Sequence, residues 1–125
     1  MFAFTMIGVN DLSLSEKFYD DILWSLNIVK ELKTERYIGY SKKNTSEIIE
    51  FYITKPFNKN VATNRNGIMI AFLAESQEVV NKFHEIALKK GAINEGSPGP
   101  RNDLDYCAYI RDADGNKICA FTPIS

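Results

Sequence analysis

The chain has 125 residues, with 15 basic and 16 acidic side chains and a net charge of −1, a size typical of one domain with its own core. A balanced charge without a basic stripe argues against nucleic acid as a partner, and apolar runs far shorter than the roughly 20 residues of a membrane-spanning helix argue against a membrane. Without a signal-peptide pattern or a CxxC motif, we expect a cytoplasmic protein whose cysteines, Cys107 and Cys119, are free and reduced.

The first half of the chain predicts one strand, one helix and three further strands. An apolar stretch over residues 2–9 predicts the first strand, and a helix follows that starts at Asp11 or Ser13 and ends near Asn27. The apolar residues that recur along this helix predict its buried face: Leu14, Phe18, Ile22 and Leu26, with Tyr19 and Leu23 alongside. The three strands are expected at residues 28–33, 36–41 and 47–54.

The second half repeats this order after a connector at residues 56–66. The shift that places Phe4 on Met69 also places Phe18 on Phe83, so the same pattern is written twice. We expect a strand at 67–74, a helix at 76–90 capped by Gly91, a short strand at 92–95, a Gly- and Pro-rich loop at 96–102, and a hairpin of strands 105–111 and 116–122. The sequence therefore predicts an α+β fold, a single domain of two βαβββ modules at about 1–55 and 67–125.

Strand alternation predicts which side chains face away from the helices. In the strand 47–54, Ile49, Phe51 and Ile53 form the row that packs on a helix, which leaves Glu50 and Tyr52 on the opposite, inner face. The same rule applied to the other strands adds Phe4, Met69, Cys119 and Phe121 to the inner faces. Pockets favour the interface between such modules, so we expect these residues to line a site.

Two motifs indicate a known family. The first half contains Ile7-Gly8-Val9-Asn10-Asp11-Leu12 followed by Phe18-Tyr19, and the second half ends on Ala108-Tyr-Ile-Arg-Asp-Ala-Asp-Gly-Asn-Lys-Ile118. In this order, and over nearly the whole chain, the sequence resembles the vicinal oxygen chelate superfamily, which includes glyoxalase I, extradiol dioxygenases and bleomycin-resistance proteins. The resemblance implies that the paired modules form a cupped, curved mixed sheet, and that the protein is a homodimer, as many members of the family are.

The resemblance also implies four metal-ligand positions, which fall on Phe4, Glu50, Met69 and Cys119 in this sequence. Strand alternation places the same four residues on the inner faces. A phenyl ring cannot bind a metal, and a thioether and a thiol are soft donors, whereas these enzymes use ions that prefer oxygen or imidazole ligands. Of the four residues, only Glu50 is a suitable ligand for such an ion, so we expect no metal cofactor. The alternative is a divalent metal bound in an unfamiliar way.

The resulting hypothesis is metal-independent binding of a small, partly apolar molecule in the cup between the modules. The expected ligand-binding residues are Phe4, Glu50, Tyr52, Met69, Cys119 and Phe121. The alternatives are a lyase or dioxygenase of the glyoxalase type, a metal-free isomerase with Glu50 as general base, and a structural or regulatory module whose cup is filled. Metal-dependent chemistry is disfavoured because three of the four ligand positions hold Phe4, Met69 and Cys119.

Five residues allow more than one interpretation. Glu50 is either withdrawn from water, where it would act as a base or bind a cationic ligand, or it has no such role. In the second case it stays hydrated or pairs with Lys117 or Arg111. His84 follows the apolar stripe of the second helix, which favours a structural role over a catalytic one. Cys107 and Cys119 are expected to act as small hydrophobes, with redox or nucleophilic roles as the alternative. Trp24 lies off the apolar stripe and reaches a partner subunit, the cavity rim or the edge of the core.

Overall fold

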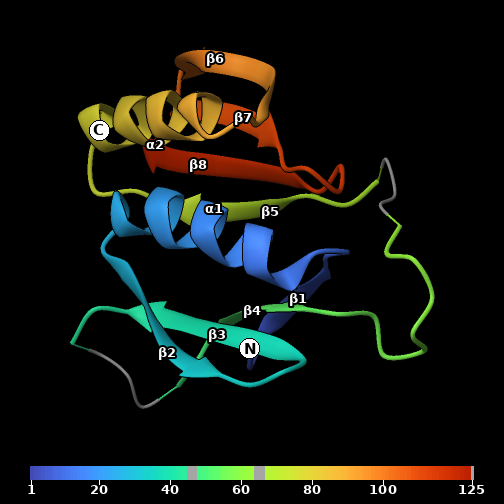
Figure 1. The fold of residues 1–125 in the computed structure, drawn as a ribbon. Coiled ribbons are helices and arrows are strands. Elements are labelled where there is room, and N and C mark those ends of the chain that lie inside the picture. Colours follow the sequence, from blue (N-terminus) through green and yellow to red (C-terminus); the bar gives the residue numbers. More distant parts are fainter. Residues whose placement is uncertain (45–47, 64–66, 125) are drawn as a thin grey trace.

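The computed structural model describes residues 1–44, 48–63 and 67–124. Within them the chain forms two four-stranded sheets, each with one helix (Figure 1). Module 1 contains β1 (Thr5–Gly8), α1 (Leu12–Trp24), β2 (Ile28–Lys33), β3 (Tyr37–Lys42) and β4 (Phe51–Thr54). Module 2 contains β5 (Ile70–Leu73), α2 (Gln77–Lys89), β6 (Ile93–Arg101), β7 (Asp105–Arg111) and β8 (Lys117–Pro123).

Both sheets have the same topology. The strand order is β1-β4-β3-β2 in module 1 and β5-β8-β7-β6 in module 2. In each sheet the first and last strands of the module run parallel, with Thr5 opposite Phe51 and Ile70 opposite Ile118, and the other pairs are antiparallel. The predicted α+β fold with mixed sheets is confirmed, and β1 and β5 are edge strands of two separate sheets rather than neighbours in one.

The helices begin where side chains cap them. The Asp11 side chain accepts a hydrogen bond from the Leu14 backbone N–H at 3.0 Å, so Asp11 and not Ser13 is the N-cap of α1. The buried face of this helix contains Leu12, Ser15, Tyr19, Ile22 and Leu23. Leu14, predicted to lie on that face, is 63% exposed, because a helix that starts at residue 12 repeats its buried face through 15, 19 and 22.

The predicted second helix is confirmed within a residue at each end. Ser76 is its N-cap, and the backbone of Gly91 has a φ of +96°, the left-handed conformation that glycine adopts easily after a helix. No described helix is both long and apolar enough to cross a membrane.

Two strand predictions need correction. Residues 96–102 were expected to form a loop, but β6 continues to Arg101 and keeps its pairing with β7 through two register shifts. Gly96 permits this because a Cβ there would come within 2.7 Å of the Tyr109 ring. The strand expected at 47–54 begins only at Phe51; residue 47 lies outside the described residues.

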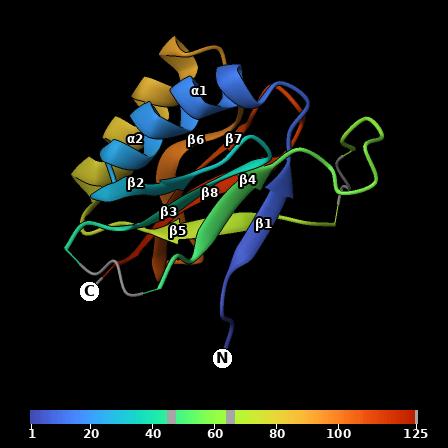
Figure 2. The same cartoon turned by 60° about the horizontal axis from the view of Figure 1, so that its bottom comes forward.

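The two modules share one hydrophobic core, with buried residues from both helices and both sheets. Figure 2 shows the two helices side by side on one side of the molecule and the sheets on the other, and α1 contacts α2 directly. Phe51 of β4 and Phe72 of β5 meet across the interface with ring centroids 5.0 Å apart and nearly perpendicular planes. Burial of this interface holds the modules together.

Polar groups also join the modules, at the turn between β7 and β8. The Tyr19 hydroxyl of α1 donates to the carboxylate of buried Asp112 at 2.6 Å, and the Asn116 side-chain amide donates to the Gly8 carbonyl at 3.0 Å. Asn10 donates to Asp114 through both its backbone N–H and its side-chain amide. We call these residues, Tyr19, Asn10, Asp112, Asp114 and Asn116, the clasp.

Candidate functional site

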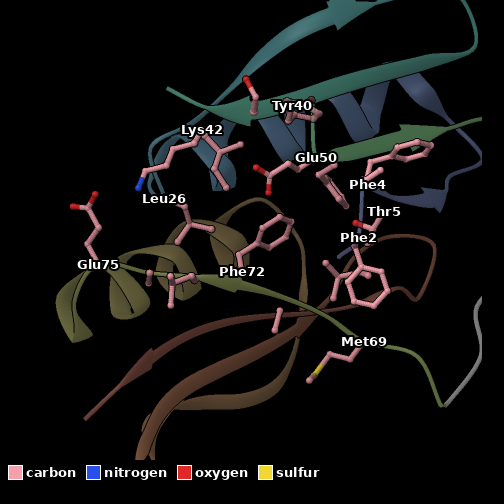
Figure 3. A pocket seen from close by; sticks show the side chains of 18 residues that line it. Phe2, Phe4, Thr5, Leu26, Tyr40, Lys42, Glu50, Met69, Phe72 and Glu75 are labelled. Carbon is pink, nitrogen blue, oxygen red and sulfur yellow. The ribbon is translucent and has the colours of Figure 1, made fainter. Parts of the chain in front are cut away.

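A cavity of about 600 Å³ lies between the two modules, at the end of the interface away from the clasp. One wall belongs to module 1 and includes residues 2–5, the end of β3, Glu50 and Phe51; the other is β5 with its flanking residues, 69–75 (Figure 3). The Phe51–Phe72 ring pair is part of both walls. The size suits a small organic molecule.

The structure brings three of the six predicted ligand-binding residues to this cavity. Phe4, Glu50 and Met69 line it, with Phe4 53% and Met69 44% exposed. Figure 3 shows Glu50 extending from one wall and Phe72 from the wall opposite. Half of the residues that strand alternation placed on the inner faces therefore line the same cavity, although they come from two different sheets.

The other three predicted residues are not part of the cavity lining. Tyr52 lies behind Phe4, with its ring centroid 5.2 Å from that of Phe4. Cys119 is buried within sheet β5-β8-β7-β6, opposite Ala71 and Tyr109, and Phe121 is half-buried opposite Leu73. The reason is topological, since the cavity follows the edge strand β5 and β8 is the next strand inward.

Glu50 is exposed to solvent in this chain, which matches the hydrated alternative. Its carboxylate has no hydrogen-bond or ion-pair partner among the described residues, and the two suggested partners are engaged elsewhere. Arg111 bonds to Glu95, and the Lys117 ammonium lies 5.1 Å from the centroid of the Tyr109 ring. Glu50 is therefore an acceptor that a ligand can reach.

The cavity contains polar residues that the sequence did not single out. Ser41 and Lys42, at the end of β3, belong to one wall, and Glu75, between β5 and α2, belongs to the other. In Figure 3, Lys42 and Glu75 lie at one end of the cavity, while Phe2 and Met69 lie at the opposite end. No motif marks these residues, because they converge only after the modules pack. The cavity thus has a charged end and an apolar end.

Ile49 does not belong to the helix-facing row that alternation predicted. Its Cγ2 atom lies 2.7 Å from where a Cβ on Gly39 would be, beside the Tyr52 ring, so Ile49 packs on the inner face. Phe51 and Ile53 are buried on the helix side as expected. Regular alternation fails at residue 49 because β4 starts two residues later and Gly39 leaves room for the isoleucine.

The two cysteines are free, buried neighbours on strands β7 and β8. Burial, together with the adjacent Cys107 thiol, raises the pKa of Cys119 to about 12. A thiol with so high a pKa is almost entirely protonated at neutral pH, which makes it a poor nucleophile. The interpretation of Cys119 as a small hydrophobic residue therefore fits its surroundings.

His84 and Trp24 also lie outside the cavity lining. The His84 ring is buried, and its Nε2 atom lies 3.0 Å from the Asn94 Oδ1 atom, so the ring links α2 to β6. Trp24 is 60% exposed, with the Lys43 ammonium 5.5 Å from the centroid of its ring. The contacts of His84 support the structural role that the sequence favoured.

Comparison with solved structures identifies the fold and the family. A glyoxalase/bleomycin resistance protein from Albidiferax ferrireducens T118 is 41% identical to this chain, each covers 98% of the other, and their TM-score is 0.88. The chain belongs to the glyoxalase/bleomycin resistance protein family. This is the grouping that the vicinal oxygen chelate motifs indicate.

More distant relatives of this glyoxalase/bleomycin resistance family member agree. A probable lactoylglutathione lyase from Synechocystis sp. is 28% identical over 121 residues, which is 91% of this chain and 88% of the relative. A lactoylglutathione lyase from Agrobacterium tumefaciens has the same fold, with 19% identity, a TM-score of 0.67 and coverage of 94% and 90% of the two chains. No family model matches the sequence.

The residues at the four family ligand positions do not fit a metal ion. Phe4, Met69 and Cys119 offer a phenyl ring, a thioether and a protonated thiol, and Cys119 lies outside the cavity that holds the other three. Hard divalent ions need several oxygen or imidazole donors, and Glu50 supplies one carboxylate. Among the described residues no three His, Cys, Asp or Glu side chains lie close enough together to hold a metal ion.

Proposed function

We propose that this glyoxalase/bleomycin resistance family member binds a small, partly apolar molecule, without a metal, in the cavity between its modules. The observation that carries the proposal is the cavity itself, about 600 Å³ with an aromatic ring pair in its walls and the carboxylate residues Glu50 and Glu75 in its lining. A filled, purely structural cup would not leave this space. We place this role in the cytoplasm, in line with two free cysteines.

Each end of the cavity has a part in this proposal. Phe4, Phe72 and Met69 provide apolar contact, which drives binding by removing ligand surface from water. Glu50 accepts hydrogen bonds from the ligand and favours a cationic or amine-bearing group, and Glu75 on the opposite wall adds a second carboxylate. The ligand is therefore amphiphilic, with its polar group toward Lys42 and Glu75.

We also propose that the protein is a homodimer. The edge strands β1 and β5, together with the residue before each, carry large apolar side chains that are about half exposed or more, namely Phe4, Met6, Met69 and Leu73. Exposed apolar side chains on strand edges are uncommon in monomers, and a second copy would cover them. Light scattering during size-exclusion chromatography tests this; a monomer at every concentration up to about 100 μM would contradict it.

A cavity-filling variant tests the binding proposal. Ala71 lines the cavity from β5 and is exposed, so Ala71→Trp should block the space without disturbing the core. In a thermal-shift screen of aromatic and alkyl amines, we expect compounds that raise the melting temperature of the wild type by several degrees and leave Ala71→Trp unchanged. Leu14→Trp, on the exposed face of α1, is the matched control and should keep the response. A screen in which both tryptophan variants respond like the wild type would contradict the proposal.

The similarity to a probable lactoylglutathione lyase makes a lyase the second candidate. Two measurements separate it from the first. Metal analysis of protein purified without chelators should find less than one ion per chain, and the protein should not form lactoylglutathione from methylglyoxal and glutathione. A stoichiometric, tightly held ion together with that activity would favour the lyase.

A further inference from the structure

Ser41 stands out among the polar residues of the structure. Its side chain is 2% exposed, and its Oγ atom is the one buried side-chain oxygen or nitrogen without a hydrogen-bond partner in the described part of the chain. Other buried polar groups are satisfied, as Asp112 is by Tyr19 and His84 by Asn94. A buried hydroxyl that lacks a partner destabilises the fold, so a native structure that keeps one calls for an explanation.

The surroundings of Ser41 do not offer an internal partner. The hydroxyl of its neighbour Tyr40 points to α1 and donates to Asp20 at 2.9 Å. The next strand contributes Val29, which pairs with Ser41 in the sheet and has an apolar side chain. Ser41 is itself a wall residue of the cavity, whose lining also includes apolar Leu26 and Ile28 from the segment that leads into β2. The cavity is therefore where a partner for this hydroxyl can enter.

We infer that Ser41 is a specificity-determining residue, whose hydroxyl donates a hydrogen bond to a neutral carbonyl oxygen of the bound molecule. Serine has one rotatable side-chain bond with three staggered positions, so a ligand in the cavity can recruit the hydroxyl by a change of rotamer. The inference rests on the proposed binding function and narrows its ligand class to amphiphilic molecules whose apolar part carries a ketone, aldehyde, ester or amide carbonyl.

The chemistry of the other polar wall residues favours a carbonyl at Ser41. Glu50 and Glu75 are carboxylates, which accept hydrogen bonds and repel a carbonyl oxygen. Lys42 can donate, but its ammonium lies at the end of the cavity, facing Glu75 (Figure 3). Thr5 also carries a hydroxyl, but it lies beside Phe2 and Phe4, away from Lys42 (Figure 3). A carbonyl group near Leu26, Ile28 and Ser41 therefore has the Ser41 hydroxyl as its neutral side-chain donor. Sites built to hydrogen-bond one group discriminate strongly against analogues that lack it.

A pair of matched probes tests the inference by equilibrium dialysis. The first is 6-propionyl-2-(dimethylamino)naphthalene, and the second is its 6-propyl analogue, which has the same apolar body without the carbonyl oxygen. For each protein, the ratio of the two dissociation constants measures the preference for the carbonyl. We expect Ser41→Ala to shift this ratio about tenfold toward the propyl compound, the effect of one lost hydrogen bond. Lys42→Met should leave the ratio within about twofold of the wild type.

The outcomes separate this inference from the proposed function. If the wild type binds neither probe, the inference is overturned, whereas the proposed function fails only if the thermal-shift screen of amines also finds no compound that Ala71→Trp blocks. If the wild type binds both and Ser41→Ala leaves the ratio unchanged, the inference alone is overturned; a shift in Lys42→Met instead would assign the contact to the lysine.

Thermal stability without ligand gives an independent check. Because the Ser41 hydroxyl lacks a partner, Ser41→Ala should melt at the same temperature as the wild type or higher. The control is Ser13→Ala, on the exposed face of α1, which should also melt no lower than the wild type. A fall of several degrees in Ser41→Ala alone would mean that the hydroxyl has a partner within the protein, and would overturn the inference.

Discussion

At the scale of single residues, the close packing around Gly39 shows how the inner face of sheet β1-β4-β3-β2 is built. The position lies on β3 under the side chains of Ile49 and Tyr52, and both approach the space that a side chain would occupy. The same Tyr52 ring contacts Phe4 at the cavity wall. Gly39 therefore supports the wall indirectly, by letting its neighbours pack close to the backbone.

We predict that Gly39→Ala destabilises the protein by about 1–3 kcal/mol, the usual effect of overpacking. The new Cβ would lie 2.7 Å from the Ile49 Cγ2 and 3.0 Å from the Tyr52 Cε1, so both side chains must move. Urea denaturation measures the free energy of unfolding. Gly67→Ala is the control, since no atom of the described residues lies within 4 Å of a Cβ at Gly67 and the change should be nearly neutral. Equal stability of the two variants would contradict the prediction.

The sequence predicted single residues unevenly, for reasons that are physical. Alternation placed Phe4, Glu50 and Met69 correctly relative to the helices because β1, β4 and β5 start close to these residues with regular pairing. It failed at Ile49, where the backbone is irregular. Ser41, Lys42 and Glu75 carried no local signal, because their proximity depends on how the modules pack and not on any motif.

At the scale of elements, a charge network joins the first helix to the second strand. Glu16 of α1 forms ion pairs with Lys30 and Lys33 of β2, the latter at 3.0 Å, and Lys30 also bonds to Asp20. The hydrogen bond from Lys30, reinforced by Lys33, lowers the pKa of the Glu16 carboxyl, while partial burial opposes the shift. The same bond to Glu16 raises the pKa of Lys30.

This network predicts that the free energy of unfolding depends on pH. A lowered carboxyl pKa in the folded state means that Glu16 stabilises the fold above its unfolded pKa, about 4.3, and that this contribution is lost as the pH falls through the folded value. Glu16→Gln should therefore cost about 1 kcal/mol at pH 7, and the difference from the wild type should vanish near pH 3. Urea denaturation across that range checks it; a constant difference at all pH values would contradict the assignment.

Element prediction succeeded where caps and turns carry the signal. Asp11, Ser76 and Gly91 mark helix ends through their side-chain or backbone chemistry, and the positions of both helices follow from them. The extension of β6 through residues 96–101 was missed, because glycine and proline usually indicate a loop. In this strand Gly96 is required by the ring of Tyr109, a contact between strands that the local sequence does not reveal.

At the scale of the whole molecule, the clasp and the shared core make the modules one unit. Asp112 is 4% exposed and accepts hydrogen bonds from the Tyr19 hydroxyl, from the Asn116 side chain and from two backbone N–H groups of its own turn. Burial and the neighbouring Asp112 carboxylate raise the pKa of Tyr19, which keeps its hydroxyl protonated as the donor. We infer that the 125 residues fold as one domain.

Removal of one clasp hydrogen bond should weaken the whole fold. Tyr19→Phe deletes a donor to a buried carboxylate, and we expect a loss of about 2 kcal/mol in the free energy of unfolding, with a single cooperative transition. Tyr106→Phe is the control, because its hydroxyl bonds to Asn81 at the surface and should contribute less than about 0.5 kcal/mol. Two separate unfolding transitions in the wild type would show that the modules are independent.

The clasp and the cavity occupy opposite ends of the module interface. A small change of angle at the clasp would therefore displace residues at the cavity. The clasp holds Asn10, just before α1, and Tyr19, past the middle of that helix, whereas Leu26, just past the end of the helix, lines the cavity. Leu26 lies seven residues beyond Tyr19, about 10 Å along a helix, so a tilt of about 10° at the clasp would displace Leu26 by about 2 Å. We therefore expect the width of the cavity to depend on the angle between the two modules, which the clasp fixes at the other end of their interface.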